Sequence, residues 1–301
     1  MAECYHASKQ EEEYGIMKKL AAMSIMAVMV LGMAACGSKE EAPAEENTAE
    51  EETAEEAPAE EAEASEEERT TFTVGFDAEY PPYGYMDENG EYTGFDLELA
   101  QAVCDLKGWE LVKTPINWDS KDMELNSGSI DCIWNGFTMN GREDDYTWSK
   151  PYVNNSQVVV TAEDSGIEVL SDLAGKIVGV QTASSALDAL NSDEHKDLTA
   201  SFAALQEFGD YNNAFVELKA GAIDAIAMDI GVAEYQLSSR GEGFRMLDEN
   251  LTEEQYAIGF KKGNDALKDE VEEALDQLVE DGTYTKLAEK YELTNYTILD
   301  K

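Results

Sequence analysis

The sequence has few of the residues on which metal binding and nucleophilic catalysis most often rely. Its two histidines, His6 and His195, lie far apart in the chain. It has four cysteines, and no two of them stand at CxxC spacing: Cys4, Cys36, Cys104 and Cys132. This spacing gives no zinc site and no Cys/His pair for nucleophilic catalysis, so we expect no metal and no cofactor.

Positive charge is also scarce. Among 301 residues, 21 are Lys or Arg and 65 are Asp or Glu, which gives a formal net charge of -44. Such a chain repels nucleic acid and anionic lipid, and we therefore exclude nucleic acid as a partner. Hydrophobic residues make up 43% of the chain, enough for one large domain or two lobes with a sizeable core.

Only one short apolar run stands out near the start of the chain. It extends from Leu20 to Ala35 and follows Met17-Lys18-Lys19. A basic start before a short apolar segment is typical of a secretory signal peptide, and the run is too short for a comfortable membrane span. We therefore interpret residues 17–35 as a signal peptide and residues 1–16 as an upstream mis-start, with Met17 as the true start. The alternative for residues 1–16 is a real extension of the signal peptide.

The apolar run ends in small residues before Cys36, an arrangement similar to a bacterial lipobox. Cys36 would then be the lipid-modified first residue of the mature chain, which anchors a secreted protein to the membrane. The alternative is an ordinary cleavage site with an incidental cysteine. Residues 39–69 hold 15 Glu against Lys39 and Arg69 and almost no bulky apolar residue, so we predict that residues 36–69 form a lipidated, acidic, disordered tether.

The stretch with the clearest chemistry begins with Ile130–Trp134, which reads as a short buried strand. The polar loop Asn135–Thr138 follows, and Arg142 comes four residues after Thr138. Arg forms a two-pronged, charge-assisted bond to a carboxylate, so this segment could hold a small acid. The alternative is a surface ion pair between Arg142 and its neighbours Glu143, Asp144 or Asp145.

Strand and helix patterns alternate along the rest of the chain, which is typical of an α/β fold with a mostly parallel sheet. We expect strands at 72–76, 110–114, 157–161, 177–180, 223–228 and 256–260, and helices at 95–106, 121–126, 170–176, 212–220, 265–278 and 283–291. Ligands on such sheets lie at the carboxyl ends of strands. The residues predicted just past strand ends are Asp77, Tyr80, Trp118 and Asn135–Thr138.

Two further strand ends carry polar residues that have a simpler explanation. Ser184 and Ser185 begin a helix whose free backbone N–H groups could hold an anion, although Ser184 could also be a plain helix cap. Asp229 could bind an ammonium group or cap the next helix. Aromatic residues could form a wall of the site, or lie in the core instead: Tyr80, Tyr83, Trp118, Trp134 and Phe137. Cys104 and Cys132 could pair or remain separate buried thiols.

Seven motifs occur in order from about Thr70 to the end of the chain. They are VGFDAEYPPYGY, GFDLELAQAV, the GFT…R segment, SKPYV, LAGKIVGVQTASSA, LKAGAIDAIAMD and DGTYTKLAEKY. With them the chain resembles the amino-acid-binding proteins of ABC importers (family 3 solute-binding proteins), akin to histidine- and glutamine-binding proteins. The resemblance implies a two-lobe clamshell of the periplasmic-binding-protein type II, with two hinge strands. Lobe 1 would be residues 70–157 plus 259–301, and lobe 2 residues 158–258.

The resemblance also implies roles for single residues. Arg142 would grip the α-carboxylate of the ligand, together with backbone N–H groups near Ser184 and Ser185. Asp229 would hold the α-ammonium, supported by Gly136 and Thr138. Cleft residues implied in addition are Asp77, Tyr80, Trp118 and Asn135. The segment between Thr138 and Arg142 is one residue shorter than the family pattern, which leaves the role of Asn140 open.

The function implied is the extracellular capture of an L-amino acid and its delivery to the transmembrane subunits of an ABC permease. Glu79 and Asp119 could meet a cationic side chain, so we expect a polar or basic amino acid, or cystine. We expect a monomer without enzymatic activity, held by the lipid at Cys36 on the outer face of a Gram-positive-type cell membrane. The alternatives are an enzyme, with Glu79 or Asp119 as general acid or base, or a sensor on the same scaffold.

Overall fold

The structure is a computed structural model, and it describes residues 69–299. The predicted mis-start, signal peptide and lipidated Cys36 lie outside the described residues, as does the tether up to residue 68. Among residues 69–299, no helix combines the length and the apolar character needed to cross a membrane.

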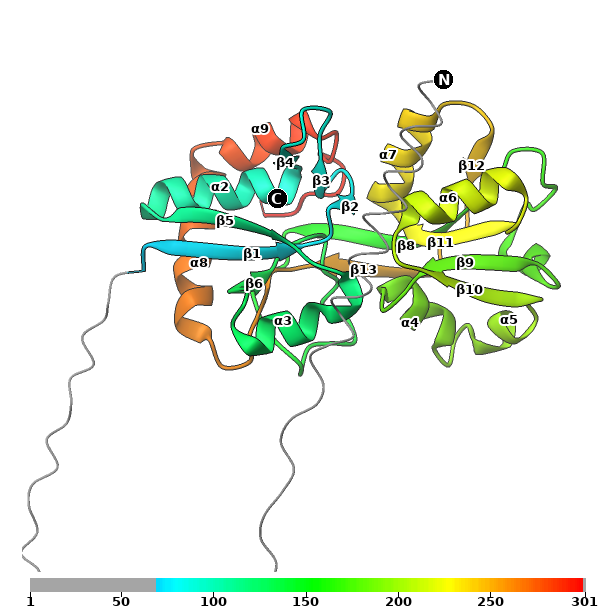
Figure 1. The fold of residues 1–301 in the computed structure, drawn as a ribbon, viewed down its shortest axis with the longest axis horizontal. Helices are drawn as coiled ribbons and strands as arrows, with labels where there is room; N and C mark the ends of the chain where they lie inside the picture. Colours follow the sequence, from blue (N-terminus) through cyan, green and yellow to red (C-terminus); the bar gives the residue numbers. More distant parts are fainter. Residues whose placement is uncertain (1–68, 300–301) are drawn as a thin grey trace, which may run out of the picture. The chain divides into compact units, whose positions relative to one another are not determined.

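The described residues build two α/β lobes, each around its own sheet (Figure 1). In lobe 1 the sheet order is β5-β1-β6-β14-β7, and β1 pairs in parallel with β5 and β6. The strands are β1 (Thr71–Phe76), β5 (Glu110–Pro115), β6 (Cys132–Ile133), β14 (Gly259–Phe260) and β7 (Thr147–Trp148). A small sheet is formed by β2 (Glu79–Tyr80), β3 (Gly84–Met86) and β4 (Tyr92–Thr93).

Four α-helices pack around the lobe 1 sheet. They are α2 (Phe95–Lys107), α3 (Lys121–Ser127), α8 (Asp265–Glu280) and α9 (Thr283–Lys290), and the short 3-10 helix η1 (Trp118–Ser120) precedes α3. Figure 1 shows α2 and α9 on one side of β1 and α3 on the other. In α8 the apolar stripe predicted from the sequence is buried, including Leu267, Val271 and Leu278. The lobe is therefore held by the helix faces that the sequence periodicity indicates.

In lobe 2 the sheet order is β10-β9-β11-β8-β12, and β13 also pairs with β8. The strands are β8 (Val153–Ala162), β9 (Ile177–Gln181), β10 (Ala204–Phe208), β11 (Ala225–Asp229), β12 (Phe244–Met246) and β13 (Thr252–Tyr256). Helices α6 (Tyr211–Ala220) and α7 (Ile230–Arg240) cover one face, and α4 (Ser185–Asn191) and α5 (Lys196–Ala200) the other (Figure 1). The predicted fold class, a type II two-lobe α/β clamshell, is confirmed.

The antiparallel strands β8 and β13 connect the lobes. Residues 153–157 of β8 pair with β13, and from Gln157 onward β8 pairs with β11 in the lobe 2 sheet. The chain returns to lobe 1 through β14. The predicted lobe boundaries, 157/158 and 258/259, fall within β8 and just before β14, and they stay a prediction.

Several predicted elements were wrong in extent, and some were missed. The strand expected at 256–260 is the end of β13 plus β14, because the chain changes sheets at Ala257 and Ile258. The helix expected at 170–176 is the 3-10 helix η2 (Leu170–Leu173), and the strand expected at 130–134 is only two residues long. Strand β10 was missed because it lies at a sheet edge with Gln206 and Glu207 exposed, which weakens its apolar pattern. The elements α5, α7 and β12 were also not predicted.

Candidate ligand-binding site

A small cavity lies between the two lobes. Its lining residues come from both lobes: Tyr80, Trp118, Asn135, Gly136, Thr138, Arg142, Gln181, Ser184, Ser185 and Asp229. The free space is about 10 Å³, roughly room for one water molecule. Nine of the ten predicted ligand-binding residues line it, and the tenth, Asp77, lines an adjoining cavity. Gln181 was not predicted, because an amide inside the LAGKIVGVQTASSA motif carries no distinct local signal.

Gly136 shapes the loop that follows β6. Its φ of 57° is favourable for glycine, and a Cβ there would stand 3.0 Å from Tyr256 and 3.1 Å from Tyr80. The backbone N–H of Gly136 donates to Asp96 Oδ2 at 2.6 Å, which ties the loop to the start of α2. The loop can therefore bring Asn135 and Thr138 to the cavity wall only because residue 136 has no side chain.

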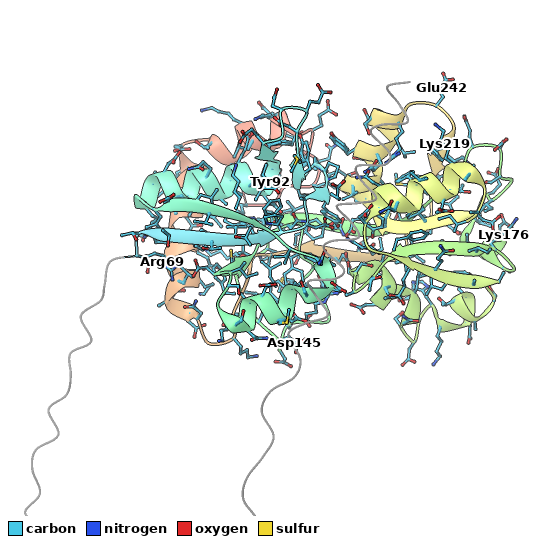
Figure 2. The ribbon with its side chains drawn as sticks, in the orientation of Figure 1. Arg69, Tyr92, Asp145, Lys176, Lys219 and Glu242 are labelled. Atoms are coloured by element: carbon cyan, nitrogen blue, oxygen red, sulfur yellow. The ribbon has the colours of Figure 1, made fainter. Side chains whose placement is uncertain are left out.

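Arg142 reaches the cavity from lobe 1, and its side chain is 13% exposed. Its Nη1 donates to the backbone O of Thr138 at 3.2 Å, and its guanidinium lies 5.5 Å from the centre of the Phe137 ring. Its Nη2 pairs with Asp188 Oδ2 on α4 at 2.6 Å, and the Asp188 side chain is 67% exposed. The alternative partners Glu143, Asp144 and Asp145 were wrong: the ion pair crosses to lobe 2, and Asp145 lies at the outer edge of lobe 1 (Figure 2).

Lys121 places a second cation close to Arg142. It is 5% exposed, and its Nζ donates to the backbone O of Ala183 at 3.2 Å and of Trp118 at 3.4 Å. Burial, and next the charge of Arg142, lower the pKa of Lys121. Lys121 thus links α3 in lobe 1 to the loop before α4 in lobe 2. This link was not predicted, because a lysine at a helix start is usually exposed.

Ser184 and Ser185 stand at the start of α4, where the loop ends. The Ser184 side chain accepts from the N–H of Leu187 at 3.2 Å, so the simple interpretation of Ser184 as a helix cap holds. Both serines also line the cavity. Ser185 Oγ lies 3.1 Å from Thr138 Oγ1, which is a direct contact between the lobes.

Asp229 provides a buried carboxylate on the lobe 2 side of the cavity, and it is 2% exposed. Its Oδ1 accepts from Asn155 Nδ2 at 2.7 Å, Gln157 Nε2 at 2.6 Å and the Tyr256 hydroxyl at 2.7 Å. Although Asp229 stands just before α7, its side chain makes no hydrogen bond to the helix end. The alternative role as a helix cap was therefore wrong for the side chain.

Glu254 on β13 is a second buried carboxylate, and it was not predicted. It is 8% exposed and shares two of its donors with Asp229, since Asn155 Nδ2 at 2.7 Å and Gln157 Nε2 at 2.6 Å also bond to its Oε1. Burial, and next the charge of Asp229, raise the pKa of Glu254. In a chain with 65 acidic residues, one more Glu in the run Thr252-Glu253-Glu254 has no local signal of a role.

Asp77 lies beside the cavity and opens onto a second one of about 350 Å³. Its Oδ2 accepts from Gln181 Nε2 at 2.7 Å, and Gln181 lines the first cavity. Burial raises the pKa of Asp77 to about 6, with smaller contributions from Asp210 and Glu79. Asp77, Glu79 and Asp210 all line the second cavity, and its lining contains no Lys or Arg. We call this second cavity the acidic mouth, and Trp118 lines both cavities.

The aromatic residues divide between the cavity and the core. Tyr80 and Trp118 line the first cavity, as one interpretation predicted. Trp134, Tyr83 and Phe137 are almost fully buried, and none of them lines this cavity. For these three the alternative interpretation, plain core packing, is the one that the structure supports.

Two further predictions concern cysteine and metal. Cys104 and Cys132 are both buried and unbonded, as separate thiols. Within residues 69–299, no group of three or more His, Cys, Asp or Glu is arranged to hold a metal ion.

The cavity therefore has two sides of opposite charge. Arg142 and Lys121 stand on the side formed by α3 and the start of α4, and the buried carboxylates Asp229 and Glu254 stand on the side of the connecting strands. Such an arrangement suits a small molecule that carries one negative and one positive group, because each charged hydrogen bond contributes about 1.5–3 kcal/mol.

Known proteins share this arrangement of lobes. Residues 72–294 match the family described as bacterial extracellular solute-binding proteins, family 3. The L-cystine-binding protein TcyJ of Escherichia coli (strain K12) is 29% identical over 228 residues, which cover 75% of this chain and 84% of that protein. The arginine-binding extracellular protein ArtP of Bacillus subtilis (strain 168) is 30% identical over 222 residues, which cover 72% and 84%.

A solved structure agrees with these relatives. The substrate-binding protein of an ABC uptake transporter from Streptococcus pneumoniae, with bound histidine, superposes with a TM-score of 0.70. It is 32% identical, and the match covers 73% of this chain and 92% of that one.

Proposed function

This chain belongs to family 3 of the bacterial extracellular solute-binding proteins, and we propose that it captures one amino acid outside the cell and delivers it to the permease of an ABC importer. The observation that carries the proposal is that Arg142 and Asp229, from different lobes, line the same cavity. An amino acid is a zwitterion, so it needs a cationic and an anionic partner at a short distance from each other. Contacts made to both lobes at once shift the balance between open and closed clefts toward the closed one.

In this proposal Arg142 grips the α-carboxylate of the ligand, together with backbone N–H groups near Ser184 and Ser185. Asp229 binds the α-ammonium, supported by Gly136 and Thr138. To make room for the ligand carboxylate, the guanidinium has to share or give up its bond to Asp188. Asn135, Tyr80 and Trp118 would contact the rest of the ligand.

The ligand class that we propose is a polar or basic L-amino acid, or cystine. The acidic mouth formed by Asp77, Glu79 and Asp210 supports a cationic group at the far end of the ligand, because three neighbouring acidic side chains attract positive charge. The relatives named above bind cystine and arginine, and the solved structure holds histidine. Glu79, proposed from the sequence for this role, lies in the mouth, whereas Asp119 does not line either cavity.

We propose that the protein binds its ligand without converting it. The relatives reported above are named as binding proteins. An enzyme on this scaffold would change the ligand during long incubation, and a sensor would bind it without a permease. Chromatography of the ligand recovered after incubation should return it unchanged, whereas a new product would favour the enzyme.

We further propose that the protein is a monomer held at the outer face of the cell membrane by a lipid on Cys36. The support comes from the sequence of residues 17–36 alone. Mass spectrometry of the protein from its native membrane should find a mature chain that begins at a lipid-modified Cys36. A mature chain that begins at another residue would contradict the anchor.

The ligand itself is best identified by a thermal-shift screen of the twenty amino acids plus cystine. A ligand that binds only the folded state raises the melting temperature, by an amount that grows with affinity. We expect one polar or basic amino acid, or cystine, to give the largest shift. A flat response to all of them would contradict the proposed function.

A further inference from the structure

We propose that Glu254 is a positioning residue of the amino-acid site: its carboxylate accepts the hydrogen bond of the Thr138 hydroxyl and so leaves the lone pairs of that oxygen for the bound ammonium group. The inference rests on the proposed function. It implies that a residue of the connecting strands helps to select the ligand. Glu254 stands on β13, one of the two strands that connect the lobes.

Glu254 contacts residues of both lobes and of the connecting strand β8. Its Oε1 lies 2.8 Å from Thr138 Oγ1 in lobe 1 and 3.2 Å from Ser185 Oγ in lobe 2. The same oxygen accepts from the amides of Asn155 and Gln157 on β8. Thr138 and Ser185 line the cavity and Glu254 does not, so Glu254 acts from behind them.

A hydroxyl has one proton to donate and two lone pairs that accept. A carboxylate is the strongest acceptor within reach of both hydroxyls, because hydrogen bonds to a charged group are about twice as strong as neutral ones. When Thr138 and Ser185 donate to Glu254, their oxygens can only accept from anything else. Ser185 Oγ lies 2.9 Å from Gln157 Nε2 and 3.1 Å from Thr138 Oγ1, so the protein already occupies its lone pairs. With its proton on Glu254 at 2.8 Å, the Thr138 oxygen can only accept, and it favours a ligand N–H over a ligand carboxylate.

The neighbouring amides support the same assignment. Asn155 and Gln157 turn their NH₂ groups to Glu254 and Asp229, and their own oxygens, Asn155 Oδ1 and Gln157 Oε1, are buried without a hydrogen-bond partner. A buried acceptor without a partner costs about 1–3 kcal/mol. Both amide oxygens are in this position because the NH₂ groups face Glu254 and Asp229. Two carboxylates held side by side in this way lower the stability of the fold and favour the binding of a cation.

The chain offers a matched control. Glu253 precedes Glu254 on the same strand, but its side chain is exposed. Glu254→Gln and Glu253→Gln remove the same charge and keep nearly the same shape. Each variant is titrated calorimetrically with L-arginine, L-histidine and L-cystine. We expect Glu254→Gln to weaken the tightest of the three by at least about tenfold, and Glu253→Gln by less than about twofold.

A double-mutant cycle distinguishes positioning from a general loss of structure. If Glu254 acts through the Thr138 hydroxyl, Thr138→Val should weaken binding in the wild type and have little further effect in Glu254→Gln. Additive losses would overturn the inference, as would equal affinities of the Glu254→Gln and Glu253→Gln variants. Melting curves check that each variant folds. If Glu254→Gln does not fold, Thr138→Val takes its place, and unchanged affinity in that variant would overturn the inference.

The same titrations separate this inference from the proposed function. A wild-type protein that binds none of the twenty amino acids or cystine would overturn the proposed function, and this inference with it. A wild-type protein that binds one of them while Glu254→Gln binds it equally well would overturn the role of Glu254 alone.

Discussion

The two charged sides of the cavity are built in different ways. On the anionic side, Asp77, Asp229 and Glu254 are all less than a tenth exposed, and amide side chains hold each of them in place. On the cationic side, Arg142 is tied to Asp188, a carboxylate whose side chain is 67% exposed. The anionic side is thus fixed by buried hydrogen bonds within the protein, whereas Arg142 on the cationic side pairs with a carboxylate that is open to water.

This difference suggests that the two sides of the cavity contribute unequally to the free energy of binding. A buried, fixed carboxylate strengthens its attraction for a cation, because little solvent reorganises when the ligand arrives. An exposed ion pair contributes only about 0–1 kcal/mol, so Asp188 can yield to a ligand carboxylate at small cost. We therefore expect the anionic side to supply most of the affinity and the cationic side to select molecules that also carry an acid group.

The largest effect that we expect concerns stability and the carboxyl group of Asp77. Its pKa is raised to about 6 by burial, so the folded protein holds this proton in a pH range where the unfolded chain loses it. The contribution of Asp77 to the free energy of unfolding should therefore fall, by up to about 3 kcal/mol, as pH rises from about 4 to 6, since each pKa unit corresponds to about 1.36 kcal/mol. Asp96, whose pKa burial raises to about 7, adds a fall of the same sign. In urea denaturation at a series of pH values, Asp77→Asn should therefore show a smaller fall than the wild type, whereas the exposed Asp119→Asn should show the same fall. The same pH dependence of unfolding in both variants would mean that the buried Asp77 carboxyl group does not lower the stability of the folded protein.

The next largest effect should follow from Asp229→Asn. This change keeps the shape but removes the charge that we propose faces the ligand ammonium. Removing one partner of a buried, hydrogen-bonded charge pair costs at least about 2 kcal/mol, so affinity should fall by at least roughly 30-fold. Calorimetry on the best amino acid of the thermal-shift screen measures this loss. A loss smaller than that of Arg142→Ala would reverse the ranking of the two sides.

Arg142→Ala should weaken binding of the same amino acid by at least about tenfold, because it removes one charge-assisted contact worth about 1.4 kcal/mol or more. The fold should remain intact, since Arg142 packs at the cavity rather than in the core. Lys150→Ala is a suitable control, because Lys150 pairs with Asp276 on the surface at 2.9 Å. Unchanged affinity of Arg142→Ala would refute the assignment of the carboxylate to Arg142.

The smallest effect should come from Asp188→Asn, and it should have the opposite sign. Without the competing carboxylate, Arg142 is free for the ligand, so affinity should rise by about two- to fivefold, as the low worth of exposed ion pairs allows. Asp193→Asn, which breaks the exposed pair between Asp193 and Lys196, should leave affinity unchanged. Weaker binding in Asp188→Asn would mean that Asp188 holds Arg142 in place instead of competing for it.

Much of the fold could be predicted because its helices and strands carry strong periodic patterns. The apolar stripe of α8 and the alternation in β1 predicted both elements to within two residues at each end. Nine of the site residues could be placed because they follow strand ends or match the motifs of a known family. These signals are local, or they depend on a pattern that the family has fixed.

The remaining features depend on contacts between residues that are distant in the sequence. Arg142 and Asp188 are 46 residues apart, and Glu254 meets Thr138 across 116 residues. Nothing near Glu254 in the sequence distinguishes it from its exposed neighbour Glu253. The α7 helix contains Gly231, which lies under the Tyr83 hydroxyl where a Cβ would stand 2.5 Å away. Close packing of this kind is visible only once both lobes are folded.

In the proposed function the protein holds both charged groups of one amino acid at once. Its most direct test is a calorimetric titration of the wild-type protein with the best amino acid of the screen and with the amide of the same amino acid, which lacks the carboxylate. We predict that the amide binds at least about tenfold more weakly, in keeping with one lost charge-assisted contact. Equal affinity for the two compounds would contradict the proposal that the protein binds the carboxylate of its ligand.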